Sequence, residues 1–175
     1  VIPDLWQMNP GEGRKRLEEM RQLGRGALAE MRTLLLELRP SALMNAELPD
    51  LLRQLTEAIT GRARIPVKLY LHGDCCIPPE VKIAFYRIAQ ESLNNVVKYS
   101  KATQVSVNFR MQPESAFISI VDNGIGFDPE SVSSNHLGLR IMRGRAEAIG
   151  AKLNIYSEKN EGTQISVSWQ LVQPD

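Results

Sequence analysis

Four polar side chains recur along one face of an expected helix in the middle of the chain. Arg87, Glu91, Asn95 and Lys98 follow one another at spacings of four, four and three residues, which places them on one side of a helix. An Asn carbonyl is a hard oxygen ligand that suits Mg²⁺, and a Lys can meet a phosphate as a point charge. A Glu one turn away could orient or deprotonate an attacking group. The same face could equally be a solvated surface held by pairing between neighbouring turns.

A glycine-containing loop, Asp-Asn-Gly-Ile-Gly-Phe, follows an expected strand at residues 122–127. Gly124 and Gly126 permit a positive φ and let a ligand approach the backbone, and Asp122 can accept a hydrogen bond from an exocyclic amine. Two such glycines often belong to an ordinary turn, so the loop is weak evidence alone. The sequence contains no GxxxxGK, which excludes a P-loop, and the third glycine of the Rossmann fingerprint is missing.

Two shorter features lie further along the chain. Residues 136–140 (His-Leu-Gly-Leu-Arg) occupy an expected loop-to-helix junction, where unpaired backbone N–H groups and the helix dipole favour an anion. Gly162 and Thr163 open the last expected strand. Each feature also has an ordinary interpretation, as a helix entry and as a turn. His136 by itself is more typical of a loop residue than of a catalyst.

The composition limits the kinds of protein that could carry these features. The chain has 175 residues, of which 43% are hydrophobic and 23% charged, which predicts one globular domain or one domain with a helical arm. A formal net charge of +1 and an aromatic content of 6% give no basis for a nucleic-acid surface, so we expect no direct nucleic-acid binding. The two adjacent cysteines and two separated histidines exclude a disulfide framework and a structural zinc site, and favour a reducing compartment.

The beginning of the chain is expected to form a helical arm. Residues 1–13 contain several prolines and glycines and are expected to be a frayed lead-in. From about Arg14 an a/d seam continues until Pro40 ends the helix. Charged flanks favour a bundle or a dimer with another chain over a core helix. The seam comprises Leu17, Met20, Gly24, Ala27, Met31, Leu34 and Leu38.

After the arm, helical and strand patterns alternate, which predicts an α+β domain from about residue 44. We expect a two-layer α/β sandwich in which a mixed, mainly antiparallel sheet carries helices on one face. The expected helices are 48–60, which Gly61 would end, 80–100 and 137–149. The expected strands are 65–71, 104–111, 116–121, 152–157 and 163–171.

Together, the order and spacing of the four features resemble a known superfamily. They are similar to the ATP-binding domain of histidine kinases, gyrase, heat-shock chaperones and mismatch-repair proteins, known as the Bergerat fold. In that resemblance, residues 90–98 form the asparagine box and residues 122–127 the first glycine box. Residues 136–139 with 142–146 form the second glycine box, and Gly162-Thr163 the closing motif. The match covers roughly residues 65–171.

The arm resembles one branch of that superfamily. Residues 29–32 (Ala-Glu-Met-Arg) and 36–40 (Leu-Glu-Leu-Arg-Pro) are similar to the second dimerisation helix of short bacterial sensor kinases. Those kinases pair with response regulators that carry a helix-turn-helix output domain, and their phosphorylated histidine lies on the preceding helix. Neither His72 nor His136 matches that histidine's motif, and the chain starts at Val1. It therefore resembles a kinase core cut after its phosphoacceptor helix, which should not phosphorylate itself.

The resemblance implies a role for each candidate residue. ATP would bind with Mg²⁺ held through Asn95, Lys98 would contact phosphate, and Glu91 would act as base or orienter toward the acceptor histidine. Asp122, supported by Thr163, would read the adenine amine. The remaining cofactor-binding positions would be Gly124, Gly126, His136, Gly138 and Leu139. The family often has His-Ala where this chain has Tyr99 and Ser100, which leaves the role of Tyr99 open.

The resemblance also implies a domain organisation and partners. Residues 1–43 would be the arm of the dimerisation and phosphotransfer domain, and residues 44–175 the catalytic domain. The γ-phosphoryl of ATP would pass to a histidine outside this chain and then to the response regulator. The full-length protein would be a homodimer with a cytoplasmic catalytic region. Whether an anchor in the inner membrane precedes this region is left open by the sequence.

Two other functions share this kind of ATP site. An anti-sigma-type serine kinase or an ATP-hydrolysing clamp domain would have similar motifs, but clamp ATPases lack the Leu-Arg-Pro helix and use a longer lid than residues 128–135. A degenerate dimerisation module without ATP binding is the third alternative. The intact Asp122, Gly124, Gly126 and Asn95 argue against that loss.

Overall fold

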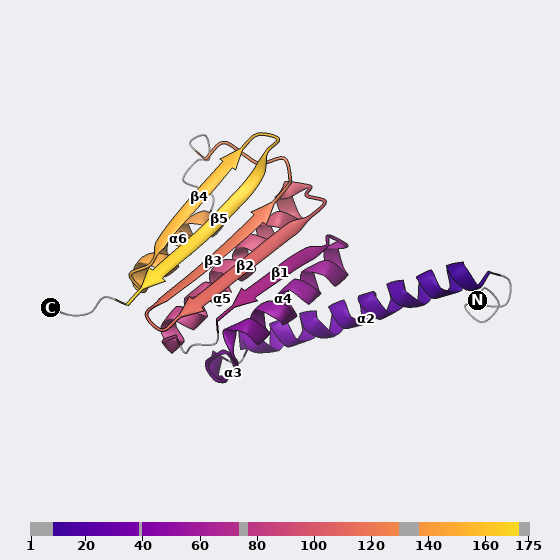
Figure 1. The fold of residues 1–175 in the computed structure, drawn as a ribbon, viewed down its shortest axis with the longest axis horizontal. Helices are drawn as coiled ribbons and strands as arrows, with labels where there is room; N and C mark the ends of the chain where they lie inside the picture. The colour runs from indigo at the N-terminus through magenta and orange to yellow at the C-terminus, as the bar shows by residue number, and fades with distance from the viewer. Residues whose placement is uncertain (1–8, 39, 74–76, 130–136, 172–175) are drawn as a thin grey trace.

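The computed structural model describes residues 9–38, 40–73, 77–129 and 137–171 (Figure 1). These residues form a helical arm followed by a sheet and its covering helices. In chain order the elements are α2 (Pro10–Leu38), α3 (Pro40–Asn45), α4 (Leu48–Ala63), β1 (Val67–His72), α5 (Pro79–Asn95), the π-helical turn η1 (Val96–Ser100), β2 (Val105–Gln112), β3 (Ser115–Asp122), α6 (Leu137–Ala148), β4 (Lys152–Glu158) and β5 (Gly162–Gln170).

The strands of the described residues join in one mixed sheet with the order β1-β2-β3-β5-β4. β1 pairs with β2 in parallel, and the other three pairings are antiparallel. The central strands β2 and β3 alternate between more and less buried residues, as expected for a sheet with one covered face. The predicted mixed, mainly antiparallel sheet is confirmed.

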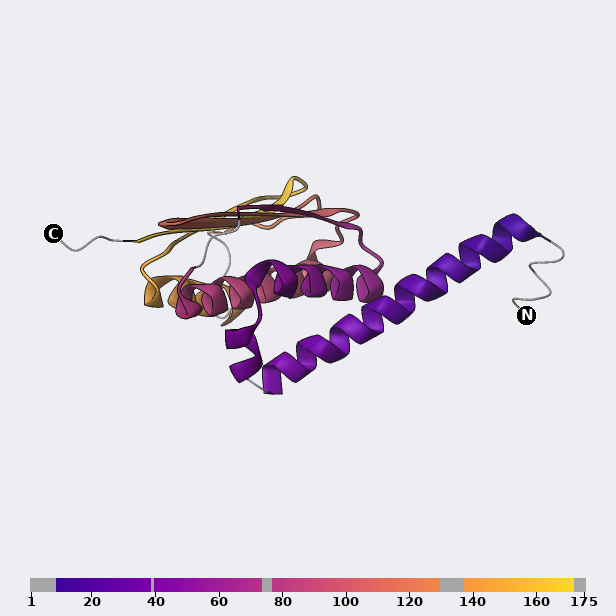
Figure 2. The same cartoon turned by 60° about the horizontal axis from the view of Figure 1, so that its bottom comes forward.

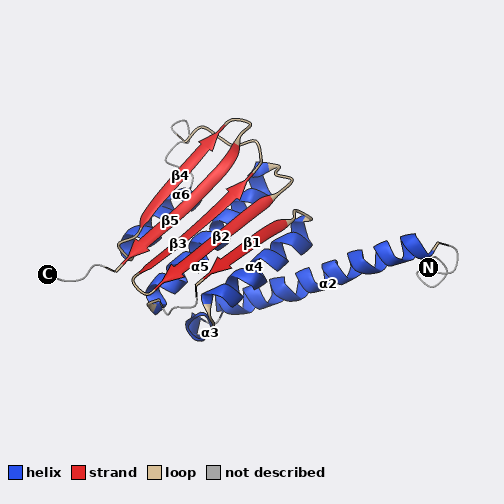
Figure 3. Ribbon diagram, in the orientation of Figure 1, coloured by secondary structure: helices blue, strands red, loops and turns tan. Residues whose placement is uncertain are grey.

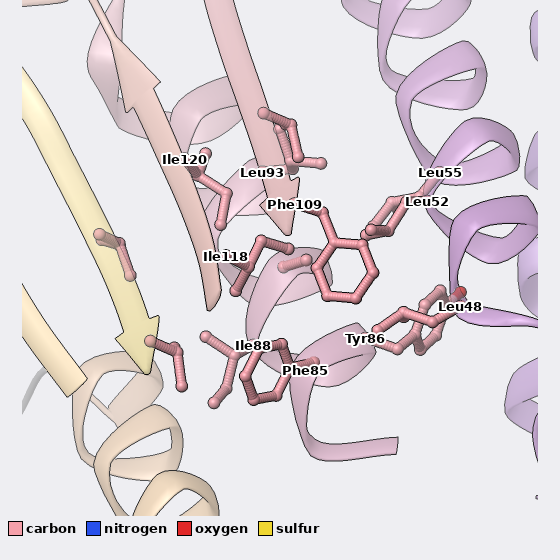
Figure 4. Packing of buried hydrophobic residues seen from close by; sticks show 14 of the residues in the cluster. Leu48, Leu52, Leu55, Phe85, Tyr86, Ile88, Leu93, Phe109, Ile118 and Ile120 are labelled. Atoms are coloured by element: carbon pink, nitrogen blue, oxygen red, sulfur yellow. The ribbon is translucent and has the colours of Figure 1, made fainter. Parts of the chain in front are cut away.

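Helices α4, α5 and α6 cover one face of the sheet, and the other face carries no helix among the described residues (Figures 2 and 3). The core lies between these two layers (Figure 4). At its centre Phe85 of α5 meets Phe109 of β2 edge to face, with ring centroids 6.3 Å apart. The predicted two-layer α+β arrangement, with helices on one face, is therefore confirmed.

The arm begins earlier than the sequence pattern predicted. α2 starts at Pro10 instead of near Arg14. Asn9 precedes it as a cap, since its side-chain oxygen accepts a hydrogen bond from the N–H of Glu12 at 3.2 Å. A proline in the first helical position loses no needed hydrogen bond, so Pro10 starts the helix instead of breaking it. The expected lead-in over residues 1–13 is therefore wrong for residues 10–13, which belong to the helix.

The arm crosses α4 (Figures 1 and 2), and two glycines are in contact between the two helices. A Cβ on Gly26 would lie 2.5 Å from the Cα of Gly61, so the two backbones are in contact. Gly61 was expected to end its helix, and this expectation is wrong. α4 continues to Ala63, and Arg64 forms the left-handed cap with φ 56°. Gly61 stands inside the helix, at the position where the backbone of Gly26 contacts it.

The short helix α3 joins the arm to the sheet and its covering helices. Leu43 on α3 is 2% exposed and belongs to the main core. The buried Lys82 of α5 donates a hydrogen bond from Nζ to the carbonyl oxygen of Met44 at 2.7 Å. A cation at the last carbonyls of a helix is favourable. α3 is thus fixed to the layer of α5. The division of the chain at residues 43 and 44 stays a prediction.

Candidate functional site

The asparagine box lies where α5 changes from an α-helix into the π-helical turn η1. The apolar side of α5, which includes Val81, Phe85 and Ile88, is buried and holds the helix on the sheet. The polar face with Glu91, Asn95 and Lys98 is left to line a cavity. Single π-helical turns occur often at functional sites, because they turn side chains away from the regular helical spacing. The sequence pattern predicted one uninterrupted helix over 80–100 and missed this turn.

A cavity of about 610 Å³ opens between the helices and the end of the sheet, a size typical of small-molecule sites. It brings together residues from all four sequence motifs, which lie far apart in the chain. Gly124 lies next to this lining, and His136 lies outside the described residues, as does most of the expected lid. The predicted site residues that line the cavity are Glu91, Asn95, Lys98, Asp122, Gly126, Gly138, Leu139 and Thr163.

Asp122 provides a buried carboxylate in this cavity. It ends β3, is 6% exposed, and accepts a hydrogen bond from the N–H of Gly124 at 2.8 Å. Burial raises the pKa of the Asp122 carboxyl, and the N–H groups of Gly124 and Thr163 oppose that rise. An acceptor held this way is suited to an N–H donor of a bound ligand.

The first glycine loop packs against the backbone of η1 on one side and of β4 on the other. The N–H of Ile125 donates to the carbonyl of Ser100 at 2.7 Å, and a Cβ on Gly124 would overlap that same carbonyl. Gly126 has φ 55°, and a Cβ there would overlap the carbonyl of Glu158. The glycines are therefore required by the packing of the loop itself. Close approach of a ligand to this backbone stays a prediction.

Asn123 holds the start of this loop in place and was missed by the sequence reasoning. Its Oδ1 accepts hydrogen bonds from the N–H of Thr103 at 3.0 Å and of Gln104 at 2.9 Å. Its Nδ2 donates to the Thr103 hydroxyl at 2.9 Å. An Asn directly after a strand often makes such bonds to backbone, which was the available signal. The partners, however, lie about twenty residues earlier in the chain.

The start of α6 lies against the functional face of α5. A Cβ on Gly138 would overlap Oε1 of Glu91 and would lie 3.5 Å from Nδ2 of Asn95. One turn further, the buried Met142 accepts a hydrogen bond at Sδ from the Ser92 hydroxyl at 3.3 Å. Glycine at 138 therefore leaves the space that the Glu91 carboxylate occupies.

The Arg145 guanidinium on α6 interacts electrostatically with two charged residues of α5, Arg87 and Glu91. Burial lowers the pKa of Arg145, the charge of Arg87 lowers it further, and the charge of Glu91 opposes both effects. Arg87 donates to Oε1 of Gln90 at 2.9 Å, and its guanidinium lies 5.8 Å from the ring centroid of Tyr86.

Ser157 on β4 is a second residue that the sequence reasoning missed. It is 4% exposed and joins the first glycine loop to the closing motif. The N–H of Phe127 donates to its Oγ at 2.9 Å, and its Oγ lies 3.0 Å from the Thr163 hydroxyl. A serine in a strand gives no signal of its own, because these contacts depend on the pairing of β4 with β5.

Comparison with known proteins identifies the family. Residues 80–173 match the family described as histidine kinase-, DNA gyrase B-, and HSP90-like ATPase, and residues 1–43 match a family described as histidine kinase. The chain belongs to this ATPase family. Membership implies that it binds ATP, and it confirms the resemblance that the motifs predicted.

The similar proteins are sensor kinases. The chain is 33% identical to the sensor histidine kinase LiaS of Bacillus subtilis over 87% of its length, which is 42% of LiaS. It is 34% identical to the sensor protein VraS of Staphylococcus haemolyticus over 83% of its length. The chain thus spans less than half the length of these relatives. Nothing in these comparisons favours the serine-kinase or clamp alternatives.

Solved structures share the fold. The histidine kinase domain of a blue-light activated kinase from Erythrobacter litoralis superposes with a TM-score of 0.56 at 20% identity, covering 89% of this chain and 96% of that one. Acinetobacter baumannii AdeS gives 0.58 at 13% identity, covering 92% of this chain and 79% of that one. Within the described ranges, no helix has the length and apolar character that a membrane span requires.

Proposed function

We propose that this chain is the ATP-binding catalytic region of a sensor histidine kinase. It would transfer the γ-phosphoryl of ATP to a histidine outside these residues, and from there to a response regulator with a helix-turn-helix output domain. The observation that carries this proposal is the convergence of four separate motifs on one cavity, with a buried carboxylate in its wall. The family and the sensor-kinase relatives support it.

In this proposal each residue has a defined task. Asp122 accepts a hydrogen bond from the exocyclic amine of adenine. Lys98, which is exposed among the lining residues, neutralises charge on the phosphates. Glu91 accepts or orients the proton of the incoming imidazole while the new N–P bond forms and the bond from the γ-phosphorus to the bridging oxygen breaks. Phosphoryl transfer of this kind depends mostly on positioning and charge neutralisation.

The residues present fit Mg²⁺. Asn95 offers a hard carbonyl oxygen to the cavity beside the Glu91 carboxylate. The described residues contain no cluster of three or more His, Cys, Asp or Glu that could hold a metal by themselves. That pattern suits an ion that takes most of its ligands from water and phosphates. Bound there, Mg²⁺ would neutralise phosphate charge.

The arm would supply dimerisation and docking of the response regulator. The apolar seam side chains that the structure describes are exposed, with Leu17 at 43% and Met31 at 63%. In the full-length homodimer this seam would pack in a helical bundle. Because ATP and response regulators are cytoplasmic, this region would work in the cytoplasm, and the full-length protein can be anchored in the inner membrane.

The test uses the full-length protein with Asn95→Ala. We expect phosphohistidine formation to fall at least about a hundredfold, while ATP affinity falls less, because losing one charge-stabilising group in a transfer site costs that much. Phosphohistidine is measured by acid-labile incorporation of labelled phosphate, and ATP affinity by calorimetry. Unchanged phosphohistidine formation would overturn the metal role. Phosphohistidine formed on the 175-residue chain alone would contradict the position of the acceptor outside it.

A further inference from the structure

Three polar side chains form a row across the covered face of the sheet at the cavity. Asp122 of β3 pairs in register with Thr163 of β5, which pairs with Ser157 of β4. Side chains in such register on one face are direct neighbours. Asp122 and Thr163 line the cavity, whereas the buried Ser157 is not among its lining residues. Ser157 could therefore reach a ligand only through Thr163.

The Ser157 hydroxyl has three polar neighbours. The N–H of Phe127 donates to its Oγ at 2.9 Å. The hydroxyl donates to the carbonyl of Gly162 at 3.0 Å. Its Oγ lies 3.0 Å from Oγ1 of Thr163, and geometry alone leaves the direction of that bond open.

Counting hydrogens settles the direction. A serine hydroxyl has one hydrogen to donate and two lone pairs that accept. The Gly162 carbonyl can only accept, so it takes the hydrogen of Ser157, and the N–H of Phe127 occupies one lone pair. The other lone pair then accepts the hydroxyl hydrogen of Thr163. This arrangement satisfies all the groups, whereas the reverse would leave the buried Gly162 carbonyl without this bond.

The direction of the hydrogen bond from Thr163 to Ser157 determines which hydrogen-bonding groups the cavity wall presents to a ligand. With its hydrogen turned toward Ser157, Thr163 presents oxygen lone pairs to the cavity, next to the acceptor of Asp122. An amino group at position 6 of a purine brings hydrogens to that wall, directly or through water. An oxo group at the same position brings another acceptor, which leaves polar groups unpaired.

We propose that Ser157 is a positioning residue that holds the Thr163 hydroxyl as an acceptor and so makes the site select 6-amino over 6-oxo purine nucleotides. This inference rests on the proposed function, because it assumes that ATP enters the cavity with its base toward Asp122. It goes beyond that function in assigning base selectivity to a residue that does not touch the ligand.

The experiment measures the affinities of the chain for ATP and for inosine triphosphate by calorimetry. Inosine triphosphate carries the oxo group at position 6 and a hydrogen on N1 that ATP lacks, and its sugar and phosphates are the same as those of ATP. In Ser157→Ala the Thr163 hydroxyl is free to rotate and donate. We expect the preference for ATP over inosine triphosphate to fall about threefold to tenfold, the size of one hydrogen bond. Ser166→Ala, a buried serine on the open face of β5, is the matched control and should leave the ratio unchanged.

Two further variants separate positioning from general support. Ser157→Thr keeps the hydroxyl and should restore the ratio to within about twofold of the starting protein. In a Thr163→Val background, Ser157→Ala should no longer change the ratio, because the group through which it acts is gone. If circular dichroism shows that Ser157→Ala does not fold, Ser157→Cys takes its place, since a thiol sulfur is only a weak acceptor for the Thr163 hydroxyl.

The outcomes distinguish this inference from the proposed function. Equal weakening of both nucleotides by Ser157→Ala would show a merely structural role and would overturn the inference. Binding of ATP without preference over inosine triphosphate would also overturn it, and would leave the proposed function standing. A chain that binds neither nucleotide would overturn both.

Discussion

The arm and the sheet domain use similar apolar patterns for opposite purposes. On α5 the apolar stripe is buried against the sheet, with Phe85 and Ile88 at 0% exposure. On α2 the described seam residues Met20 and Met31 are 55% and 63% exposed, whereas Gly26, which is outside the seam, is buried against Gly61 of α4. A periodic apolar pattern therefore predicts a helix, but it does not predict what covers that helix.

The largest expected effect is a loss of stability when a core residue of the sheet domain is truncated. Phe85→Ala should lower the free energy of unfolding by about 3–5 kcal/mol, because it removes a fully buried ring that packs on Phe109. Met31→Ala, on the exposed seam, should change it by less than about 0.5 kcal/mol. Both values come from denaturant unfolding of the chain. Similar losses for the two variants would show that the seam is part of the domain core.

The crossing of the arm over α4 gives the second prediction. Gly26→Leu should cost about 1–3 kcal/mol of the packing between α2 and α4, because its side chain would overlap the backbone of Gly61. Spin labels on α2 and α4 should then show a longer and broader distance distribution. Gly24→Leu is the matched control, since a Cβ there meets nothing within 4 Å. A distance unchanged by Gly26→Leu would contradict the crossing.

The smallest expected effect is a gain in stability from a substitution at a helical glycine, Gly144, where there is open space for a side chain. Gly144 lies in the middle of α6, and a Cβ there would meet nothing within 4 Å. Gly144→Ala should therefore stabilise the chain by about 0.5–1 kcal/mol, through helix propensity alone. Thermal unfolding measures the gain. A loss of stability would indicate that α6 has a neighbour at this position.

Most of the fold was predictable from local patterns in the sequence. The strand and helix periods predicted the order of elements and the sheet with one covered face, and the structure places Pro49 and Pro79 in first helical turns. The conversion of α5 into a π-helical turn at Val96 was not predictable, because it breaks the helical period without a Gly or Pro. The position of Gly61 also required knowledge of Gly26, which lies far away in the chain.

The candidate site divides in the same way. The residues that line the cavity, such as Asp122 and Asn95, belong to motifs whose types and spacing are readable in the sequence. The residues that hold those motifs, Asn123 and Ser157, act through hydrogen bonds set by strand pairing. Residue type and local spacing could not identify them, because a serine or asparagine near a strand end has many ordinary uses.

The central claim is that the cavity binds ATP with its base against Asp122, and calorimetric titration of the chain with ATP and Mg²⁺ tests it most directly. The chain should bind ATP. Asp122→Asn should abolish binding, because an amide cannot accept hydrogen bonds as the carboxylate does, while its unfolding transition stays cooperative. ATP affinity unchanged by Asp122→Asn would contradict the account.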